Sequence, residues 1–584
     1  MNQKPSKDRS LISKKYYSML LGGTLTMMVV SALLMSDSII AGSVIGADAV
    51  AGITLVTPLY SLAAFFGAVF SLGVPIVYST EMGKFNKKEA DHVFGFGLLM
   101  SISISVLLFL VIILFGDSYL KSCTPPVTVL HEARGYLHWM RFTVLLLPLQ
   151  MLIAAVVYND GDETLSTAAN LVQGIGNIAG SIILSKQMGI RGIGLASFLF
   201  NVVALGILSL HFLKKSNSLR INFYFSVKLL KTVVRYSIID SGSYLFLAGL
   251  TAILNSFISG RFGSEYLITV SAIALCRELQ IVFDGIGEAI TPILSIYLGE
   301  ENTPGIKLIY RLAKKTAVVE GIVVTAALAV SAPLIPKILS IKETHLTNCV
   351  IREIRIIAIG SVFISILYLL TSYYLLIEKI SLGLIMSAFR DVIMPGILAV
   401  PLGIIFGLNG VFIGMATAPA ATLLLLSIYT CIRYGRKNSP LLLSELNWRG
   451  EPYLFSLITE PVEIIALQKK VETLLVEKNF DKKAIGRAKL LIEELFMLIR
   501  EKNDDKAVLC ECSIILLPDM VRIIVKDDGN LFDISEDDVT VTSLTAFAVS
   551  AYMNNLGQDK RYLTTMSLNR SAFEIKKGTS ANTN

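Results

Sequence analysis

Long apolar stretches dominate the first three quarters of the chain. Between residues 16 and 433, runs of about 20 mostly apolar residues alternate with short polar segments, and a helix of that length can cross a bilayer. Several runs contain Gly, Pro, Ser or Thr, which membrane helices tolerate. The pattern predicts an all-α polytopic membrane protein with twelve spans, centred near residues 28, 65, 105, 148, 177, 202, 248, 282, 326, 367, 393 and 422.

The pattern changes near residue 445, where charged residues become frequent. FDKKAIGRAKLLIEELFMLIREK is typical of a helix that packs on a soluble core. Its predicted apolar face consists of Ile485, Ala488, Leu491, Ile492, Leu495 and Ile499. VLCECSIILL and MVRIIVKDDGNLFDI alternate as strands do, with Cys510 and Cys512 on one face. LTAFAVSAYMNNL predicts a helix and KRYLTTMSLNRSAFEIKK a strand, so we expect a compact α/β sandwich domain at residues 445–578.

The membrane part repeats itself. GADAVAGITLVTP begins at Gly46 and GSEYLITVSAIAL at Gly263, and each is followed by a span that contains a proline. The loops MGIRGIG and FGLNGVF recur at nearly the same offset. Two six-span lobes of one orientation follow, at residues 16–213 and 236–434, with a cytoplasmic N-terminus at 1–15 and a basic linker at 214–235. Transporters with parallel repeats bind substrate between the halves.

Composition and charge fit a membrane protein and not a nucleic-acid-binding one. Only 17% of the 584 residues are charged, and the mean hydropathy is +0.65. Within residues 1–437, most Lys and Arg residues fall in the N-terminus and in alternate loops, which predicts that both termini are cytoplasmic. This topology explains the net charge of +7. We expect a monomer in the lipid bilayer of the plasma membrane, with no nucleic-acid partner.

Six segments carry a further signal in their order and spacing. They are SDSIIAGSVIGADAVAGITLVTPLYSL, YSTEMGKFNKKEA, NDGDETLSTAANLVQGIGNIAGSIIL, MGIRGIGLAS, ITPILSIYLGEEN and SAFRDVIMPGILAVPLGIIFGLNGVFIG. Over residues 16–434 the chain thus resembles the multidrug and toxic compound extrusion (MATE) family. The resemblance implies a secondary transporter and not an enzyme. It also implies that small organic, amphipathic or cationic compounds are exported in exchange for protons or sodium ions.

One carboxylate, Asp37, lies inside the first predicted span. A charge there costs roughly 2.5–3.5 kcal/mol on insertion scales, so an intramembrane acid is by default a functional hypothesis. In one MATE branch the coupling ion binds in the first lobe. The resemblance places four residues at that site: Asp37, Asn177, Ser181 and Ser197. Ser181 replaces an acid that the family often has, so a proton on Asp37 is a simpler coupling ion than sodium, and no other metal is expected.

The second lobe contributes further acids. Asp284 and Glu288 lie four residues apart and therefore share a helix face, where they could bind a cation or substrate. The alternative for this region is a helix-end ion pair of Glu278 with Arg277 or Arg390. Other MATE branches place acids on spans 7 and 10, but the predicted tenth span, IAIGSVFISILYLLTSYYLL, has none. That departure favours the first-lobe site.

The C-terminal domain resembles the ATP-binding domain of anti-sigma-factor and histidine kinases in the order of its elements. LLIEELFMLI matches the helix with the conserved acid, whose acidic positions are Glu493 and Glu494, but Leu498 stands at the magnesium-binding Asn position. VKDDGNLFD matches the adenine-binding loop at Asp527 and Gly529, whereas VTSLTAFAV lacks the glycines of a phosphate-binding lid. We expect a degenerate site with weak or no ATP hydrolysis and no cofactor. The sequence leaves open whether the site binds a nucleotide or a cytoplasmic protein partner. An ordinary Asp-Gly turn is the alternative.

Two other functions fit parts of the pattern. A flippase for a lipid-linked sugar, from the same superfamily, would need a wide basic cavity, but the spans carry few Lys or Arg residues. A membrane receptor with an ATP-dependent kinase tail would need the missing Asn and lid glycines. Among six cysteines, Cys123 and Cys349 fall in predicted outside loops, and the sequence leaves open whether they form a disulfide.

Overall fold

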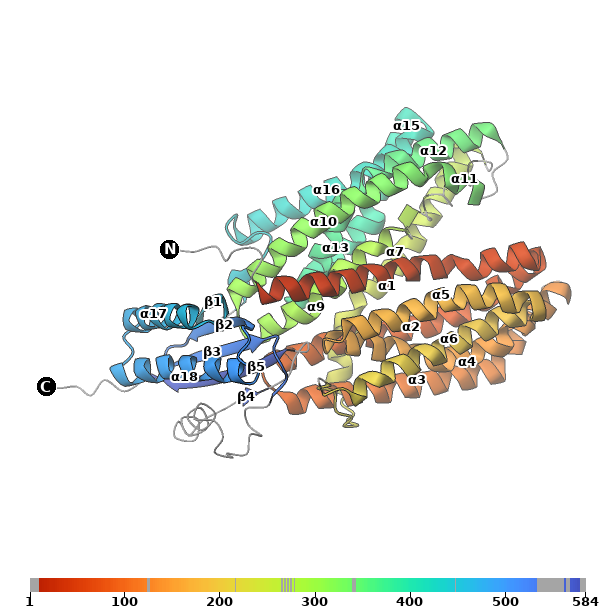
Figure 1. Ribbon diagram of the computed structural model, residues 1–584. Helices are drawn as coiled ribbons and strands as arrows, with labels where there is room; N and C mark the ends of the chain where they lie inside the picture. The colour runs from red at the N-terminus through yellow and green to blue at the C-terminus, as the bar shows by residue number, and fades with distance from the viewer. Residues whose placement is uncertain are drawn as a thin grey trace.

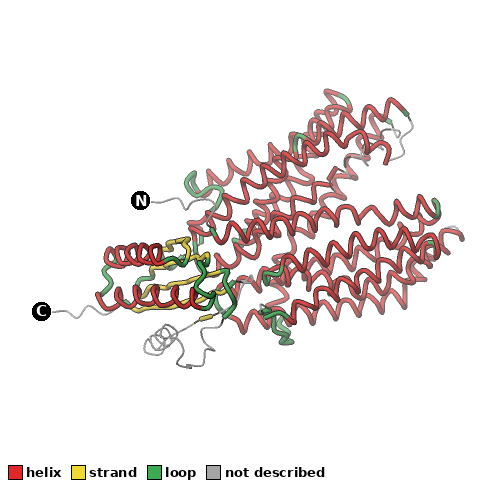
Figure 2. Tube along the Cα trace, viewed as in Figure 1, coloured by secondary structure: helices red, strands yellow, loops and turns green. Residues whose placement is uncertain are grey.

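Helices fill the membrane part of the molecule, and a small sheet with two helices forms a separate layer at one end (Figures 1 and 2). A computed structural model describes residues 10–122, 127–215, 217–263, 266, 269, 273, 276–277, 279–338, 343–446, 448–532, 561–562 and 568–577. Residues 451–577 are called the tail below. The predicted all-α membrane protein with an α/β C-terminal domain is confirmed.

The first lobe is a bundle of long helices that lie side by side (Figure 1). Ser10 caps the first of them, because its hydroxyl accepts a hydrogen bond from the Ser13 N–H at 3.5 Å. The helices are α1 (Leu11–Val44), α2 (Ala47–Gly83), α3 (Lys87–Ser122), α4 (Val127–Asn159), α5 (Glu163–Met188) and α6 (Ile190–Ser209).

The second lobe follows the same plan with more interruptions. A bend of 48° separates α12 from α13, and a π-turn at Phe389–Ile393 separates α14 from α15. The helices are α7 (Val227–Phe262), α9 (Asp284–Gly299), α10 (Thr303–Ser331), α11 (Ile335–Ile338), α12 (Thr344–Ala358), α13 (Ser361–Leu376), α14 (Ile380–Ala388), α15 (Met394–Phe406) and α16 (Leu408–Tyr434).

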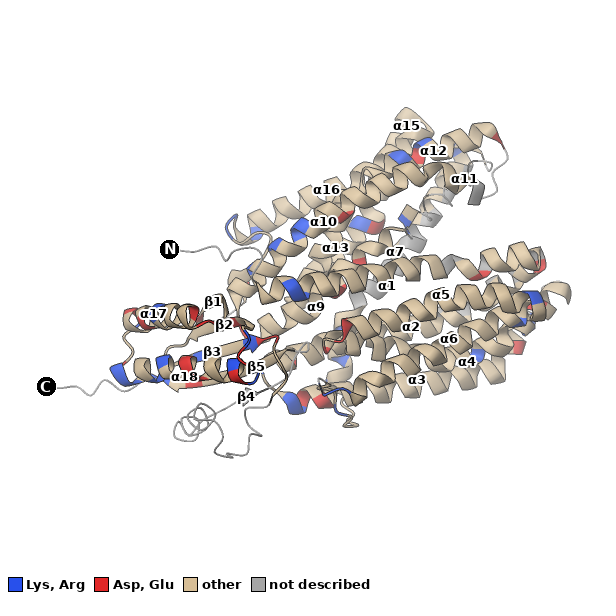
Figure 3. Cartoon of the chain, in the orientation of Figure 1, with Lys and Arg blue, Asp and Glu red and all other residues tan. Residues whose placement is uncertain are grey.

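The length and composition of these helices suit a bilayer. Within the described residues, ten helical segments are long and apolar enough to span one, or eleven if the bent pair α12 and α13 counts as one span. Helix α7, which has 36 residues and is the first helix of the second lobe, comes in addition to these segments. Figure 3 shows that charged residues are sparse along the membrane helices and frequent in the tail. This distribution is the one that a hydrocarbon environment requires.

The internal repeat predicted from the sequence is visible in the backbone. Gly189 and Gly407 precede α6 and α16 and have φ of +60° and +67°, a region that L side chains seldom adopt. A Cβ atom on Gly192 would lie 2.3 Å from the Leu184 oxygen, and one on Gly410 would lie 1.9 Å from the Leu402 oxygen. The glycines in MGIRGIG and FGLNGVF therefore serve the same tight turn in the two lobes.

The lobes touch next to the tail and diverge toward the opposite end (Figure 1). Two contacts are close enough to bring backbone against backbone. A Cβ atom on Gly83 of α2 would lie 3.0 Å from the Cα of Gly299 in α9. One on Gly285 of α9 would lie 2.7 Å from the Thr24 nitrogen in α1. We call the end of the membrane helices at Gly83 and Gly299 the tail side.

The tail is a sheet covered on one face by two helices (Figures 1 and 2). The strands are ordered β1-β2-β3-β5-β4, and the described pairs are antiparallel. The elements are β1 (Glu451–Ile458), α17 (Pro461–Glu477), α18 (Lys482–Glu501), β2 (Leu509–Leu516), β3 (Met520–Asp527), β4 (Arg561–Tyr562) and β5 (Asn569–Lys576). The predicted helix 544–556 lies outside the described residues.

The two faces of this sheet have different partners. All six residues of the predicted apolar face of α18 are buried, and they pack against Cys510 and Cys512 of β2, which confirms that these two cysteines share a face. The alternate residues of β2, such as Glu511 and Ser513, point the other way, toward the membrane part. The tail thus uses one face for its own core and the other to contact the lobes.

Candidate functional site

Asp37 lies in α1 inside the first lobe and has one hydrogen-bond partner among the described residues. Its Oδ2 accepts a hydrogen bond from the Tyr136 hydroxyl of α4 at 2.8 Å. Its Oδ1 is inaccessible to solvent and has no partner in the described part of the chain. Because an ionised carboxylate accepts several hydrogen bonds, Asp37 is left with acceptor capacity that a proton or a cation would satisfy.

The other three predicted first-lobe residues form one buried polar chain. The Asn177 amide donates to Ser197 Oγ at 3.1 Å and accepts a hydrogen bond from Ser181 Oγ at 3.0 Å. The chain continues to Asn201, whose amide donates to the Ser197 carbonyl at 2.7 Å. Asn201 Oδ1 is buried and has no partner among the residues that the structure describes. Helices α5 and α6 thus present several oxygens inside the lobe.

The structure brings Asn177, Ser181 and Ser197 together, but no described hydrogen bond joins them to Asp37. Sequence reasoning did not identify Tyr136 and Asn201. The sequence does contain a signal for Asn201, because this residue lies four positions after Ser197 and therefore on the same helix face. Tyr136 had none, because it lies 99 residues from Asp37 in the sequence.

In the second lobe, two carboxylates face consecutive residues of α1. Glu288 of α9 lies against Gly23, since a Cβ atom on Gly23 would be 3.2 Å from Glu288 Oε2. Glu320 of α10 accepts a hydrogen bond from the Thr24 hydroxyl at 3.4 Å, and its Oε2 is buried without a partner in the described chain. These acids lie where the two lobes touch.

Asp284, the other predicted second-lobe acid, has a basic neighbour. It is close enough to Arg390 to interact with it electrostatically. Arg390 itself forms an ion pair with Asp391 at 2.8 Å and stacks on the Tyr368 ring at 3.9 Å. Arg277 pairs with Asp391 at 2.5 Å, while its predicted partner Glu278 lies outside the described residues. A cation that binds at Asp284 would have to compete with Arg390.

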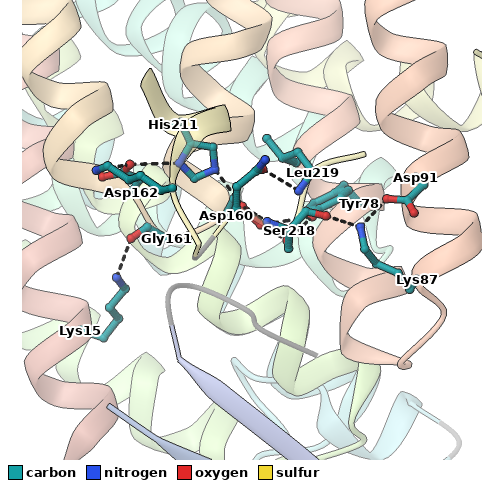
Figure 4. A network of polar contacts seen from close by, with 12 residues as sticks. Lys15, Tyr78, Lys87, Asp91, Asp160, Gly161, Asp162, His211, Ser218 and Leu219 are labelled. Carbon is teal, nitrogen blue, oxygen red and sulfur yellow. Dashed lines mark hydrogen bonds and ion pairs between the residues drawn. The ribbon is translucent and has the colours of Figure 1, made fainter. Parts of the chain in front are cut away.

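A further polar cluster lies at the tail-side end of the first lobe (Figure 4). His211 is fully buried, with Nε2 at 2.9 Å from Asp160 and Nδ1 at 3.0 Å from Asp162. Asp160 also contacts the Tyr78 hydroxyl and Ser218, the latter in the linker between the lobes. Although burial acts to raise it, hydrogen bonds from His211 and Lys214 lower the pKa of Asp162 to about 2. The cluster anchors the linker to the first lobe.

Cys349, one half of the possible disulfide, is a free thiol in the structure. Its Sγ donates a hydrogen bond to Glu353 Oε1 at 2.7 Å within α12. Cys123 lies outside the described residues.

In the tail, the predicted nucleotide-site residues are held by the chain itself. Asp527 Oδ1 accepts hydrogen bonds from the Gly529 N–H at 3.0 Å and from the Asn569 amide at 2.8 Å. The Asn503 side chain covers Gly529, where a Cβ atom would lie 2.5 Å from Asn503 Nδ2. These contacts are those of an Asp-Gly turn that is fastened to its neighbours.

The helix that should bind magnesium does not provide the ligand. Leu498 is 1% exposed and belongs to the apolar core between α18 and the sheet. Glu494 is partly exposed on the same helix, and burial, then the adjacent Glu493, raises its pKa. The glycine-poor segment VTSLTAFAV lies outside the described residues.

Asp527→Asn is expected to stabilise the tail at neutral pH. Burial raises the pKa of Asp527 to about 6, although Asn569 and the Gly529 N–H act to lower it. The folded state therefore holds a proton that the unfolded state loses near pH ~4, so stability falls as pH rises from about 4 through 6. An asparagine keeps the acceptor oxygen without this loss, which is worth roughly 1–3 kcal/mol above pH 6.

Hydrogen exchange of the β3 and β5 amides in the full chain measures this effect. The variant should exchange more slowly than wild type at pH 7.5 and equally at pH 4. Asp519→Asn, an exposed position in the β2–β3 turn, is the control and should change neither rate. Faster exchange in Asp527→Asn at pH 7.5 would contradict the expectation.

Comparison with known proteins identifies a family segment and the fold of the membrane part. Residues 24–183 match the MatE family model. No curated protein matches the chain. Among solved structures, a MATE in complex with MaL6 is 20% identical with a TM-score of 0.66, covering 75% of this chain and 98% of its own.

Two further structures share the fold. An outward-facing multidrug resistance MATE family transporter of the MOP superfamily is 20% identical with a TM-score of 0.64, covering 76% of this chain and 100% of its own. A MOP superfamily transporter from Pyrococcus furiosus, described as having a binding pocket of reversed polarity, is 19% identical with a TM-score of 0.64. The match covers 76% of this chain and 99% of that transporter. The resemblance to the MATE family is thus confirmed: the chain carries a MatE segment at 24–183, and its membrane part has the fold of MATE transporters.

Proposed function

We propose that the protein is a secondary transporter that exports small organic, amphipathic or cationic compounds across the plasma membrane in exchange for a cation. The tail side is the cytoplasmic side in this proposal, in agreement with the distribution of Lys and Arg residues. Transport would proceed by alternating access, in which the two lobes separate first on one side and then on the other. The fold shared with MATE transporters supports this mechanism.

The observation that carries the proposal is the state of Asp37. A buried carboxylate within a membrane helix is costly unless it is protonated or paired. Asp37 has one tyrosine hydroxyl on Oδ2 and no described partner on Oδ1. Uptake of a proton or a cation therefore stabilises such a carboxylate in the closed site. This stabilisation is lost when the site opens to water.

The coupling ion favoured by this arrangement is the proton. Sodium prefers several oxygen ligands around one point, whereas the oxygens of Asn177, Ser181 and Ser197 bond one another and have no described bond to Asp37. A proton needs only the carboxylate. Sodium coupling would require that Asp37 and this polar chain approach each other during the transport cycle.

Transport in vesicles tests the site. We expect that wild-type protein in proteoliposomes moves a fluorescent cation such as ethidium when a pH gradient is imposed. Asp37→Asn should reduce this gradient-driven transport by roughly 5- to 150-fold, the range of typical coupling free energies. A sodium gradient imposed in parallel identifies the ion.

Asp117→Asn is the matched control, because Asp117 is an acid that lies half-exposed beside Lys121 and Arg134. It should transport like wild type. If Asp37→Asn still couples dye movement to either gradient as wild type does, Asp37 is not the coupling site. If wild type moves no organic cation but flips a lipid-linked sugar, the flippase alternative replaces the exporter.

For the tail we propose a role without catalysis. The buried Leu498 and the internally bonded Asp527 both argue against magnesium-dependent ATP hydrolysis and against the kinase-receptor alternative. Binding of a fluorescent ATP analogue to the full chain, with magnesium, would favour that alternative.

A further inference from the structure

We infer that the tail is a lock on the contact between the two lobes: it docks on both helix ends at the tail side, and the lobes separate there only after the tail is released. The inference rests on the proposed transport function, because alternating access requires that separation. It gives a conformational role to the tail, which lies outside the MatE segment.

The docking surface is the sheet face that the tail helices leave open. Three charged side chains on it, one each from β2, β3 and β5, are buried against the membrane part. Glu511 and Arg570 are 0% exposed, and Lys526 is 1% exposed. Lys and Arg side chains are almost never buried this fully unless they are paired. The face is therefore an interface and not a solvated surface.

Arg570 of β5 contacts both lobes at once. Its Nη1 and Nη2 donate to the backbone oxygens of Met82 and Gly83, at 2.5 and 2.6 Å, where α2 of the first lobe ends. Its Nε donates at 2.7 Å to Glu300, the residue after α9 of the second lobe. The last carbonyls of a helix lack intrahelical partners and attract a cation. The fork of an arginine can hold both groups, as an ammonium could not.

Lys526 of β3 completes the network. Its ammonium lies 2.9 Å from Glu300 and 3.1 Å from Glu511, and 4.3 Å from the centre of the Tyr297 ring. The Tyr297 hydroxyl donates to Glu511 at 2.7 Å. Two acids and two bases thus neutralise each other in a buried interface. Such a network is favourable when complete and costly when one member is removed.

The loops after α2 and α9 are both recognised by the sheet. Phe85 packs into an apolar patch of Ile515, Ile524 and Ala572, and its ring lies 3.6 Å beneath the Arg570 guanidinium. On the other lobe, the Asn302 amide donates to Ser513 Oγ at 2.8 Å.

These two loops follow Gly83 and Gly299, the residues at which the lobes touch. A Cβ atom on Gly299 would lie 2.7 Å from the Gly83 Cα. If the lobes move apart here, Arg570 can no longer reach the α2 carbonyls and Glu300 together. The docked tail thus binds only the arrangement in which the tail side is shut, and a domain that binds one state shifts the population toward it.

Distances between the lobes in the full chain test the lock. Spin labels at Lys88→Cys of α3 and Lys307→Cys of α10, both exposed, report the tail-side separation in an otherwise cysteine-free protein. With the wild-type tail we expect one short distance. Arg570→Met should move most molecules to a longer distance, and Glu300→Gln, which changes the membrane side of the same contact, should do the same.

Arg522→Met is the matched control, because Arg522 pairs with Glu574 at 2.7 Å within the tail. It should keep the short distance. Wild-type distances in folded Arg570→Met and Glu300→Gln would overturn the lock. If Arg570→Met does not fold, Phe85→Ala carries the same test. The labels report lobe separation whether or not a compound is exported, so failure of the lock and failure of the proposed transport are seen separately.

Discussion

Asp391→Ala is expected to destabilise the second lobe by about 3–5 kcal/mol, the cost of removing one partner from a buried ion pair. Asp391 accepts hydrogen bonds from Arg277 at 2.5 Å and from Arg390 at 2.9 and 2.8 Å. Asp391 and Arg390 are both 3% exposed at the side chain. Alanine would leave two guanidinium groups close together in a membrane helix bundle without the carboxylate that neutralises them.

Thermal unfolding of the purified protein in detergent measures the loss. Asp117→Ala is the comparison, since Asp117 also pairs with two cations, Lys121 and Arg134, but at the exposed end of α3. Surface pairs contribute little, so this variant should melt like wild type. Equal melting temperatures for Asp391→Ala and wild type would show that the arginine pair finds another counter-charge, for which Asp284 is a candidate because it interacts electrostatically with Arg390.

Gly285→Val is expected to reduce transport to near background. Gly285 lies where α9 crosses α1, and a Cβ atom there would lie 2.7 Å from the Thr24 nitrogen and 2.8 Å from the Thr24 Cα. Because these are backbone atoms, no side-chain rotation relieves the clash, and the two helices must move apart. A transporter whose lobes no longer close on one side leaks or stalls, since alternating access needs both closed forms.

Dye transport in proteoliposomes under the pH gradient provides the measurement. Gly206→Val is the control, because nothing lies within 4 Å of a Cβ atom at that position of α6. It should transport as wild type does. Normal transport by a correctly folded Gly285→Val protein would contradict the view that this helix crossing must close.

The features that could be predicted from the sequence are those with a regular period. Apolar runs of bilayer length predicted the membrane helices, and the 3.6-residue period of apolar residues predicted the buried face of α18. The repeat gave the equivalent turns at Gly192 and Gly410. Strand β1 and helix α17 were missed. For β1 the reason is that the short stretch EPYLFSLI has no clear alternation, and its pairing with β2 is decided by tertiary contacts.

Long-range polar contacts were not predictable in the same way. Arg570 and Glu300 are 270 residues apart, and Tyr136 and Asp37 are 99 apart. Alternation along β2 and β5 puts Glu511 and Arg570 on the face opposite the apolar core. A charged strand face is ordinarily one that water covers, so only the folded chain reveals that the membrane part covers this one.

The two helix ends that the tail recognises are copies of one motif. After Gly83 and after Gly299 the chain makes the same turn, with φ of +59° at Phe85 and +60° at Glu301. The residue directly after the glycine differs in the sign of its charge: it is Lys84 in the first copy and Glu300 in the second. The two lobes are related by pseudo-symmetry, so the single tail domain meets two nearly identical helix ends. The reversed charge gives only one of them an anion for Arg570 and Lys526, and so breaks the symmetry that duplication created.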